Sequence, residues 1–352
     1  YSKAIVGTVS GTSISFGSDV VFGGNTYTNI PIRAVFDSSN NKVVVAYQDA
    51  NNSNYGTARV GTVSGTSISF GSAVVFESAA VQNTLSAAFD STNNKVVIAY
   101  DDGGNSSYGT AIVGTVSGTS ISFGSPTVFE SAAITFASAA FDSTNDKVII
   151  AYRDTGNSDY GTAVVGTVSG TSISFGSPVV FESGRADDIS VAYDSTNDKV
   201  VISYKDNPND GYGTVIRGSV SGTSISFDTP AHVFHSDSTE YTSIAFDSGN
   251  SKLVVAYKDN ENNLGEAVVM DSTTLISTNL TSSNFLGFSN AAYSDGDTAT
   301  IQITGATDDA QSGLTTARKH YVQNDGTLST TAGSPSVEAG TAISATEIIV
   351  KG

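Results

Sequence analysis

Short stretches of apolar residues, separated by Gly, Ser, Asn and Asp, run through most of the chain. Residues 120–123 alternate polar and apolar side chains, which is typical of a strand with one face in water. Residues 95–100 are apolar at nearly every position, which indicates a strand that is buried on both faces. The pattern predicts a protein built of many short β-strands.

The strands belong to a repeat of about 52 residues, present in five copies. A string of the form Gly-Thr/Ser-Val-Ser-Gly-Thr-Ser-Ile-Ser-Phe begins at Gly7, Gly61, Gly114, Gly166 and Gly218. An Asp that follows Phe or Tyr recurs at Asp37, Asp90, Asp142, Asp194 and Asp247. A buried-type strand ends in a tyrosine at Tyr47, Tyr100, Tyr152, Tyr204 and Tyr257.

Each copy predicts four antiparallel strands, because the connections between them are short enough for hairpins. In the second copy these strands cover residues 85–89, 95–100, 110–116 and 120–123. The first carries paired alanines, the second is apolar on both faces, and the fourth has one polar face. This order from inner to outer strand is typical of a blade of a β-propeller.

The predicted fold class is therefore all-β, with a propeller of four-stranded blades in residues 1–262. The hairpin of residues 1–22 supplies strands three and four, and residues 242–259 supply strands one and two. Joining these ends closes a ring of five blades, which we favour. Residues 266–277 resemble a decayed outer hairpin, so a ring of six or more blades is the alternative. We assign residues 263–280 to this degenerate hairpin or linker, and residues 281–352 to a small antiparallel β domain.

Charge and cysteine content narrow the classes of partner. The formal net charge is −18, with 34 acidic and 16 basic residues, so partners that need basic patches, such as nucleic acid and anionic membranes, are not expected. There is no cysteine, which excludes disulfides and thiolate metal sites. The chain starts at Tyr1 inside a repeat, so we expect processing or a longer parent sequence.

Comparison of the five copies predicts where a ligand binds. The turns within the hairpins hardly differ, whereas the connections from strand four to the next strand one differ strongly. Such diversity on one face of a rigid scaffold favours a binding surface, although relaxed constraint in loops is the alternative. The candidate residues in these connections are Tyr27, Arg185, Asp187, Asp188, Glu240 and Tyr241. For Arg185 and its two acidic neighbours, a salt bridge in a solvated loop is the simpler interpretation.

The connections from strand two to strand three share a second pattern. Each has an Asp followed six residues later by Tyr, at Asp49 and Tyr55, Asp102 and Tyr108, Asp154 and Tyr160, and Asp206 and Tyr212. The oxygens could coordinate Ca²⁺, but one carboxylate per loop is a weak donor set, and a self-capped turn explains the pattern better. The tyrosines are further candidates for stacking on sugar rings. We otherwise expect no cofactor.

Catalysis is not expected. A propeller glycosidase needs a unique pair of carboxylates, whereas most acids here recur in every copy. The Asp-box of sialidases is missing, and the chain has no Trp and only three scattered His. A propeller glycosidase is therefore a remote alternative.

Three C-terminal segments carry a family resemblance: residues 284–289 (Asn-Phe-Leu-Gly-Phe-Ser), 321–330 (Tyr-Val-Gln-Asn-Asp-Gly-Thr-Leu-Ser-Thr) and 339–346 (Ala-Gly-Thr-Ala-Ile-Ser-Ala-Thr). They resemble a module of structural proteins of marine tailed phages, such as those that infect cyanobacteria. The Val-Gly-Thr-Val-Ser-Gly-Thr-Ser-Ile-Ser-Phe repeat also looks like arrays in phage tail-fibre or virion-surface proteins.

This resemblance implies a non-enzymatic protein at the virion surface, outside the cell, in a tail fibre or host-attachment component. Its implied partners are other virion proteins and a host-surface receptor, which we expect to be a glycan. Nucleic acid binding and membrane insertion are not expected, and an oligomer is compatible with the repeat. A decoration protein of the virion and a bacterial surface adhesin or lectin are the alternatives.

Overall fold

The computed structural model describes residues 1–24, 32–273, 275, 287–289, 301–322, 327–332 and 336–351. The chain forms two compact units, Tyr1–Val268 and Val269–Gly352. The described residues lie mostly in strands, and their only helical segments are the single turns η1 (Gly103–Asn105) and η2 (Asn207–Asn209). No described helix has the length and apolar character needed to cross a membrane.

The second blade shows the architecture that the others repeat. Its strands β10 (Leu85–Asp90), β11 (Lys95–Asp102) and β12 (Tyr108–Ser117) pair side by side and antiparallel. The fourth strand is split, because β13 (Ser120–Phe123) and the first half of β14 (Thr127–Asp142) both pair with β12. The four strands thus follow the inner-to-outer order that the sequence predicts.

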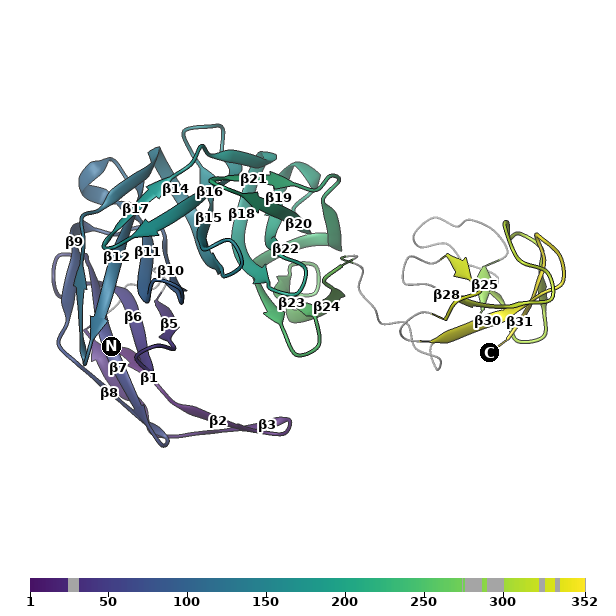
Figure 1. Ribbon diagram of the computed structural model, residues 1–352, viewed down its shortest axis with the longest axis horizontal. Coiled ribbons are helices and arrows are strands. Elements are labelled where there is room, and N and C mark those ends of the chain that lie inside the picture. The colour runs from purple at the N-terminus through teal and green to yellow at the C-terminus, as the bar shows by residue number, and fades with distance from the viewer. Residues whose placement is uncertain are drawn as a thin grey trace. The chain divides into compact units, whose positions relative to one another are not determined.

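Figure 1 shows the blades following one another along the first unit, from purple through teal to green. The first blade consists of β5 (Arg33–Asp37), β6 (Lys42–Asp49), β7 (Tyr55–Ser64), β8 (Ser67–Phe70) and β9 (Val74–Ala80). The third continues from β14 through β15 (Lys147–Asp154), β16 (Tyr160–Ser169) and β17 (Ser172–Phe175) into β18 (Val179–Asp194). The fourth continues from β18 through β19 (Lys199–Asp206), β20 (Tyr212–Ser221) and β21 (Ser224–Phe227) into β22 (His232–Asp247). The fifth continues from β22 through β23 (Lys252–Asp259) into β24 (Leu264–Asp271).

The repeated Asp fixes the turn between strands one and two. Asp90 Oδ1 accepts hydrogen bonds from the backbone N–H groups of Thr92 at 3.0 Å and Asn93 at 2.8 Å. The turn closes at Asn94, which has φ 54°, a left-handed conformation that Asn tolerates. This Asx turn explains why the Asp-Ser-x-Asn string recurs from blade to blade.

An aromatic pair joins each blade to the next. Phe129 is in the last strand of the second blade, and Tyr152 is in the third blade. The centres of their rings are 5.2 Å apart. Tyr152 is fully buried, and its hydroxyl donates to Glu130 Oε2 at 2.9 Å. The same packing recurs in the pairs Phe22–Tyr47, Phe76–Tyr100, Phe181–Tyr204 and Phe234–Tyr257.

The carboxylates at these junctions make stability depend on pH. Burial is the main cause that raises the pKa of Glu77, Glu130 and Glu182 above the usual value of 4.5. A carboxyl whose pKa is higher in the folded state binds protons more tightly there, so its stabilising contribution is complete below the unfolded pKa and is lost as pH rises through the folded pKa. The carboxylates with lowered pKa values include Glu240, which is half-buried, and Asp247, which is exposed. Their contribution to stability is lost only as the pH falls through the folded pKa, below the usual value of the group.

We therefore expect the melting temperature to rise as the pH falls from neutral toward about 4.5, the usual value of these groups. Thermal unfolding followed by circular dichroism across this range measures the effect. A variant with Glu77→Gln, Glu130→Gln and Glu182→Gln should give a flatter profile than the parent. An equally steep profile would show that these three groups are not the cause.

Small residues allow the innermost strands of successive blades to approach each other. The backbone N–H of Ala139 donates to Ser86 Oγ at 2.9 Å, from the third blade to the second. The same bond joins Val191 to Ser138 and Ile244 to Ser190, each at 3.1 Å. The serine side chains of strand one thus join the innermost strands of successive blades.

Three of the connections between blades differ from the prediction. They are not loops, because β14, β18 and β22 each run without interruption from the outer edge of one blade to the inner strand of the next. Each long strand has a bulge shortly after it changes partner, and there Phe136, Asp188 and Tyr241 have φ of 53°, 50° and 56°. A bulge lets the strand bend into the next sheet while its backbone stays hydrogen-bonded on either side.

The predicted closure of the ring by residues 1–22 also differs from the structure. There, β1 (Ser2–Ala4) pairs with β4 (Val20–Gly23), and β2 (Gly7–Ser10) pairs with β3 (Ser13–Phe16). Phe22 packs on Tyr47, so this half-blade precedes the first blade as each blade precedes its successor. The third-strand position of the fifth blade, which the hairpin was expected to fill, is occupied by β24. Residues 264–271 thus supply the last blade with a third strand, in the region that the sequence analysis assigned to a degenerate hairpin or linker.

The second unit contains a five-stranded antiparallel sheet. Its order is β27 (Thr307–Asp308), β31 (Ile348–Val350), β30 (Val337–Ala342), β28 (Lys319–Val322) and β29 (Leu328–Ser329). A short pair, β25 (Phe288–Ser289) and β26 (Ile301–Gln302), lies apart from it in the hydrogen-bond pattern. The hydrophobic core of the second unit includes Val322, Val337 and Ile348. Of the segments that carry the family resemblance, residues 284–286 and 323–326 lie outside the described residues.

Candidate functional site

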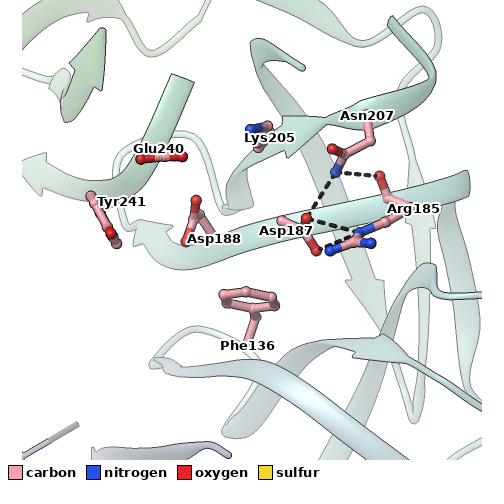
Figure 2. A pocket seen from close by; sticks show the side chains of 8 residues that line it. All are labelled: Phe136, Arg185, Asp187, Asp188, Lys205, Asn207, Glu240 and Tyr241. Carbon is pink, nitrogen blue, oxygen red and sulfur yellow. Dashed lines mark hydrogen bonds and ion pairs between the residues drawn. The ribbon is translucent and has the colours of Figure 1, made fainter. Parts of the chain in front are cut away.

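A pocket of about 440 Å³ lies where the bulges of three successive blades meet. Figure 2 shows its lining, which consists of Phe136, Arg185, Asp187, Asp188, Lys205, Asn207, Glu240 and Tyr241. Five of these residues are among the candidates that the comparison of the copies singles out. Residues from the strand 4–1 connections and from the end of a strand 2–3 connection thus share one site, as expected for one face of a propeller.

The bulges place the variable side chains at the pocket. In the fourth blade the pairing of β18 with β19 jumps from Asp187 to Ser190, so Asp188 lies outside the regular ladder. The hydroxyl of Thr242 donates to the backbone carbonyl of Asp188 and ties this bulge to the fifth blade. Phe136 and Tyr241 occupy the same bulge position in the third and fifth blades.

Asp187 is the centre of a hydrogen-bond network on one wall. Its Oδ2 accepts from Arg185 Nε at 2.9 Å and from Asn207 Nδ2 at 3.1 Å. Its Oδ1 accepts from the guanidinium of Arg153, which lies 4.9 Å from the centre of the Phe136 ring. The side chains of Asp187 and Arg153 are only 12% and 13% exposed. The salt bridge of Arg185 and Asp187 thus exists, and it joins an Arg185 side chain that is 55% exposed to a nearly buried carboxylate in the continuous strand β18.

The opposite wall is more open. Glu240 pairs with Lys258 Nζ at 3.1 Å, and the hydrogen bond from this ammonium group lowers the pKa of Glu240. Burial raises the pKa of Asp188, although the backbone N–H of Tyr241 and the charge of Lys205 act in the opposite direction. The Tyr241 ring is 72% exposed. The pocket therefore presents an accessible aromatic ring beside carboxylate, ammonium and amide groups.

Sequence reasoning missed Phe136, Lys205 and Asn207 of the lining, and Arg153 behind it. The sequence contains a signal for Arg153 and Lys205, because each follows the repeated tyrosine of strand two. This position is occupied by Gln48, Asp101, Arg153, Lys205 and Lys258 in the five copies. It varies as strongly as the strand 4–1 connections, so the same comparison would have identified it.

The remaining candidates lie elsewhere. Tyr27 lies outside the described residues. Four tyrosines each begin strand three of a different blade, are half-buried, and do not line the pocket; they are Tyr55, Tyr108, Tyr160 and Tyr212.

The loop aspartates proposed for Ca²⁺ belong to four separate blades. Asp154 Oδ1 accepts from the N–H groups of Gly156 at 2.9 Å and Asn157 at 3.2 Å, and Asp102 Oδ1 accepts from Gly104 N–H at 2.9 Å. Asp49 caps its loop in the same way, while Asp206 makes no such side-chain bond. Within the part of the chain that the structure describes, no three His, Cys, Asp or Glu side chains gather closely enough to hold a metal ion. The self-capped turn accounts for the motif in three of the four loops.

Comparisons with known proteins bear on the fold. The structure is similar to an arginine-to-alanine triple mutant of AofleA from Arthrobotrys oligospora, with a TM-score of 0.50, 10% identity and 74% of each chain covered. The SapL1 lectin in complex with alpha methyl fucoside gives a TM-score of 0.45 at 14% identity, over 79% of this chain and 83% of that one. A prolyl endopeptidase gives 0.42 at 14% identity, over 69% of this chain and 33% of that one. No protein-family model and no curated protein matches the sequence. The chain is an all-β protein of propeller-type blades followed by a small antiparallel β unit.

Proposed function

We propose that this protein is a non-enzymatic, carbohydrate-binding β-propeller that holds a glycan in the pocket of Figure 2. One observation carries the proposal. Variable residues of the third, fourth and fifth blades converge on one pocket, while the scaffold around them is repeated almost unchanged. Binding sites commonly combine a rigid scaffold with variable residues at one end.

The chemistry of the lining suits a sugar. The exposed Tyr241 ring offers an apolar surface for the C–H face of a pyranose and a hydroxyl for hydrogen bonding. Asp188 and Glu240 can accept hydrogen bonds from sugar hydroxyls, and Lys205 can donate them. Asp187 is already paired with two guanidinium groups, so its role is to position the wall. A few fixed polar groups beside an apolar surface are the usual make-up of a small-ligand site.

The place of action follows from the sequence resemblance alone. We propose a virion-surface protein of a tailed phage, in a tail fibre or host-attachment component, whose pocket takes a host-surface glycan. A decoration protein that packs against other virion subunits is the second candidate, and it should bind assembled particles but not isolated glycans.

We expect Tyr241→Ala and Asp188→Ala each to weaken glycan binding on the order of tenfold, because each removes a group that faces the ligand. A glycan array identifies the ligand, and titration calorimetry with the best glycan measures the affinity. Tyr1→Ala is the matched control, since Tyr1 is also exposed but lies away from the pocket. Equal affinity of parent and pocket variants would contradict the site, and an array without binding would contradict the function. Release of cleaved sugar from the bound glycan would contradict the non-enzymatic assignment.

A further inference from the structure

Lys205 lines the pocket with an ammonium group that has no partner among the residues that the structure describes. Its position, directly after the repeated tyrosine of strand two, is basic in three successive blades, and the other two residues are Arg153 and Lys258. Arg153 forms ion pairs with two aspartates, and Lys258 pairs with Glu240 at 3.1 Å. Lys205 forms no ion pair and no hydrogen bond with any described side chain. The fourth blade therefore holds a positive charge of the kind that the third and fifth blades neutralise.

The hydrogen bonds of Asp187 explain why this carboxylate does not pair with Lys205. The two residues are direct partners in the ladder of β18 and β19. Cross-strand partners lie on the same face of a sheet, close enough for opposite charges to interact. Both oxygens of Asp187 are nevertheless taken, by Arg153 of the preceding blade and by Arg185 and Asn207 of the wall. Three cations thus share one carboxylate, and Lys205 is the one that remains unpaired.

The residue before strand three makes room for Lys205. It differs from copy to copy and is Asn54, Ser107, Asp159, Gly211 and Asn263 in turn. In the third blade, Asp159 Oδ1 lies 3.5 Å from Arg153 Nε and balances part of its charge. In the fourth blade, glycine removes that carboxylate, and a Cβ at Gly211 would lie 2.9 Å from Lys205 Cε. Gly211 therefore withholds a partner from Lys205 and leaves the space in which its side chain lies.

The charges at the pocket favour a negative ligand over a positive one. Lys205 is half-buried, and an ammonium group that has lost part of its water gains from pairing with an anion. Asp188 is the lining carboxylate that forms no ion pair in the described part of the chain. Burial raises the pKa of Asp188, so its anionic form is disfavoured and repels an acidic ligand less.

We propose that the glycan bound in this pocket is acidic, and that its carboxylate or sulfate group pairs with the ammonium group of Lys205. This inference rests on the proposed function and names the class of sugar. Arg185 uses Nε for its bonds with Asp187, so its two terminal nitrogens can donate to the same ligand. The formal charge of −18 does not oppose this, because salt at physiological ionic strength screens charges beyond about 8 Å and the local groups decide.

A glycan array that pairs each acidic glycan with a neutral counterpart tests the proposal on the full chain. The acidic glycans carry uronic acids, sialic acids or sulfate esters, and the counterparts are their methyl esters or the desulfated glycans. We expect the tightest ligands to be acidic. Titration calorimetry should give an affinity at least about tenfold higher for the acidic glycan than for its counterpart. The array also shows whether the anionic group is a carboxylate or a sulfate.

Two variants separate the charge of Lys205 from its place. Lys205→Met should weaken binding of the acidic glycan about tenfold and change that of the neutral counterpart by less than about twofold. Gly211→Asn changes no charge but fills the space beside Lys205, so it should also weaken the acidic glycan selectively. Asn occupies this left-handed position in the first and fifth copies, so the backbone tolerates it.

Lys199→Met is the matched control, because it removes the same charge from the other end of β19. There Lys199 Nζ donates to Ser219 Oγ, and neither residue lines the pocket. This variant should bind both glycans like the parent. Circular dichroism melts confirm that each variant folds, and if Lys205→Met does not fold, Gly211→Asn and the two glycans on the parent decide.

The outcomes separate the acidic specificity from glycan binding itself. Equal affinity of the parent for the acidic glycan and its neutral counterpart would overturn the specificity and leave glycan binding intact. An equal loss for both glycans in Lys205→Met would also overturn it, because Lys205 would then act without regard to the charge of the ligand. Binding of no glycan at all would contradict the proposed function, and the acidic specificity with it.

Discussion

Replacing Tyr152 by alanine is expected to lower the free energy of unfolding by about 3–5 kcal/mol. The ring is fully buried at the junction of the second and third blades, where it packs against Phe129. Its removal leaves a cavity. The strands around it cannot move in to fill this cavity, because hydrogen bonds hold them in their sheets. It also removes the hydroxyl that donates to Glu130, a partly buried carboxylate.

Urea-induced unfolding followed by circular dichroism measures this loss. Tyr152→Phe keeps the ring and removes only the hydroxyl, so it should cost about 1 kcal/mol. Tyr1→Ala, at an exposed tyrosine, should change the free energy by about 0.5 kcal/mol at most. If Tyr152→Ala were no more harmful than Tyr1→Ala, the aromatic junction would not hold the blades together.

The second large effect is expected from Gly176→Val, which should destabilise the protein by about 3 kcal/mol. Gly176 ends the outer hairpin of the third blade and touches the turn of the fourth. A Cβ at this position would lie 1.9 Å from the backbone oxygen of Thr223, so one of the two blades must move. The same close approach occurs at Gly71 and Gly124, which explains why the Phe-Gly pair recurs.

Gly170→Asn is the matched control for this prediction, because Gly170 lies in the turn of the same hairpin. It has φ +62°, and no other group lies within 4 Å of the place that a Cβ would take. Asn tolerates this left-handed conformation, so the change should cost about 1 kcal/mol at most. The same urea titration compares the two variants, and equal losses would refute the role of close approach between blades.

The blade itself could be predicted because the chain repeats it. Each turn and each strand is seen five times, so the Asp at position 90 and its counterparts separate a structural requirement from chance. The alternation in residues 120–123 and the apolar run in residues 95–100 then order the strands from outside to inside. Burial and hydrogen bonding within one blade are local properties, and a repeated local pattern reports them well.

The connections between blades could not be predicted in the same way. Three of the four residues 185–188 are charged, which is typical of a loop, yet they lie in the continuous strand β18. They can be polar because they line a pocket, and because Arg153 of the preceding blade neutralises Asp187. That partner is 34 residues away in the sequence, and only the packing of blades brings it near.

The ends of the repeat were also hard to interpret. In β24 the Tyr-Gly that begins strand three elsewhere has become Leu264-Gly265, and the Val-Ser-Gly-Thr turn is missing. This loss of similarity weakened the signal for a third strand in the last blade, and the favoured interpretation therefore placed the N-terminal hairpin there. Strand pairing depends on backbone geometry, which survives when the repeated residues do not.

The bulges in β14, β18 and β22 separate the residues that hold the sheet from those that can change. Phe136, Asp188 and Tyr241 lie at a break in the paired register, shortly after each strand has taken its new partner. A new side chain there does not shift the register of either sheet, whereas a slip by one residue elsewhere would turn every side chain to the wrong face. Natural selection, or a laboratory library confined to these positions, can therefore search for new specificities while the scaffold stays folded.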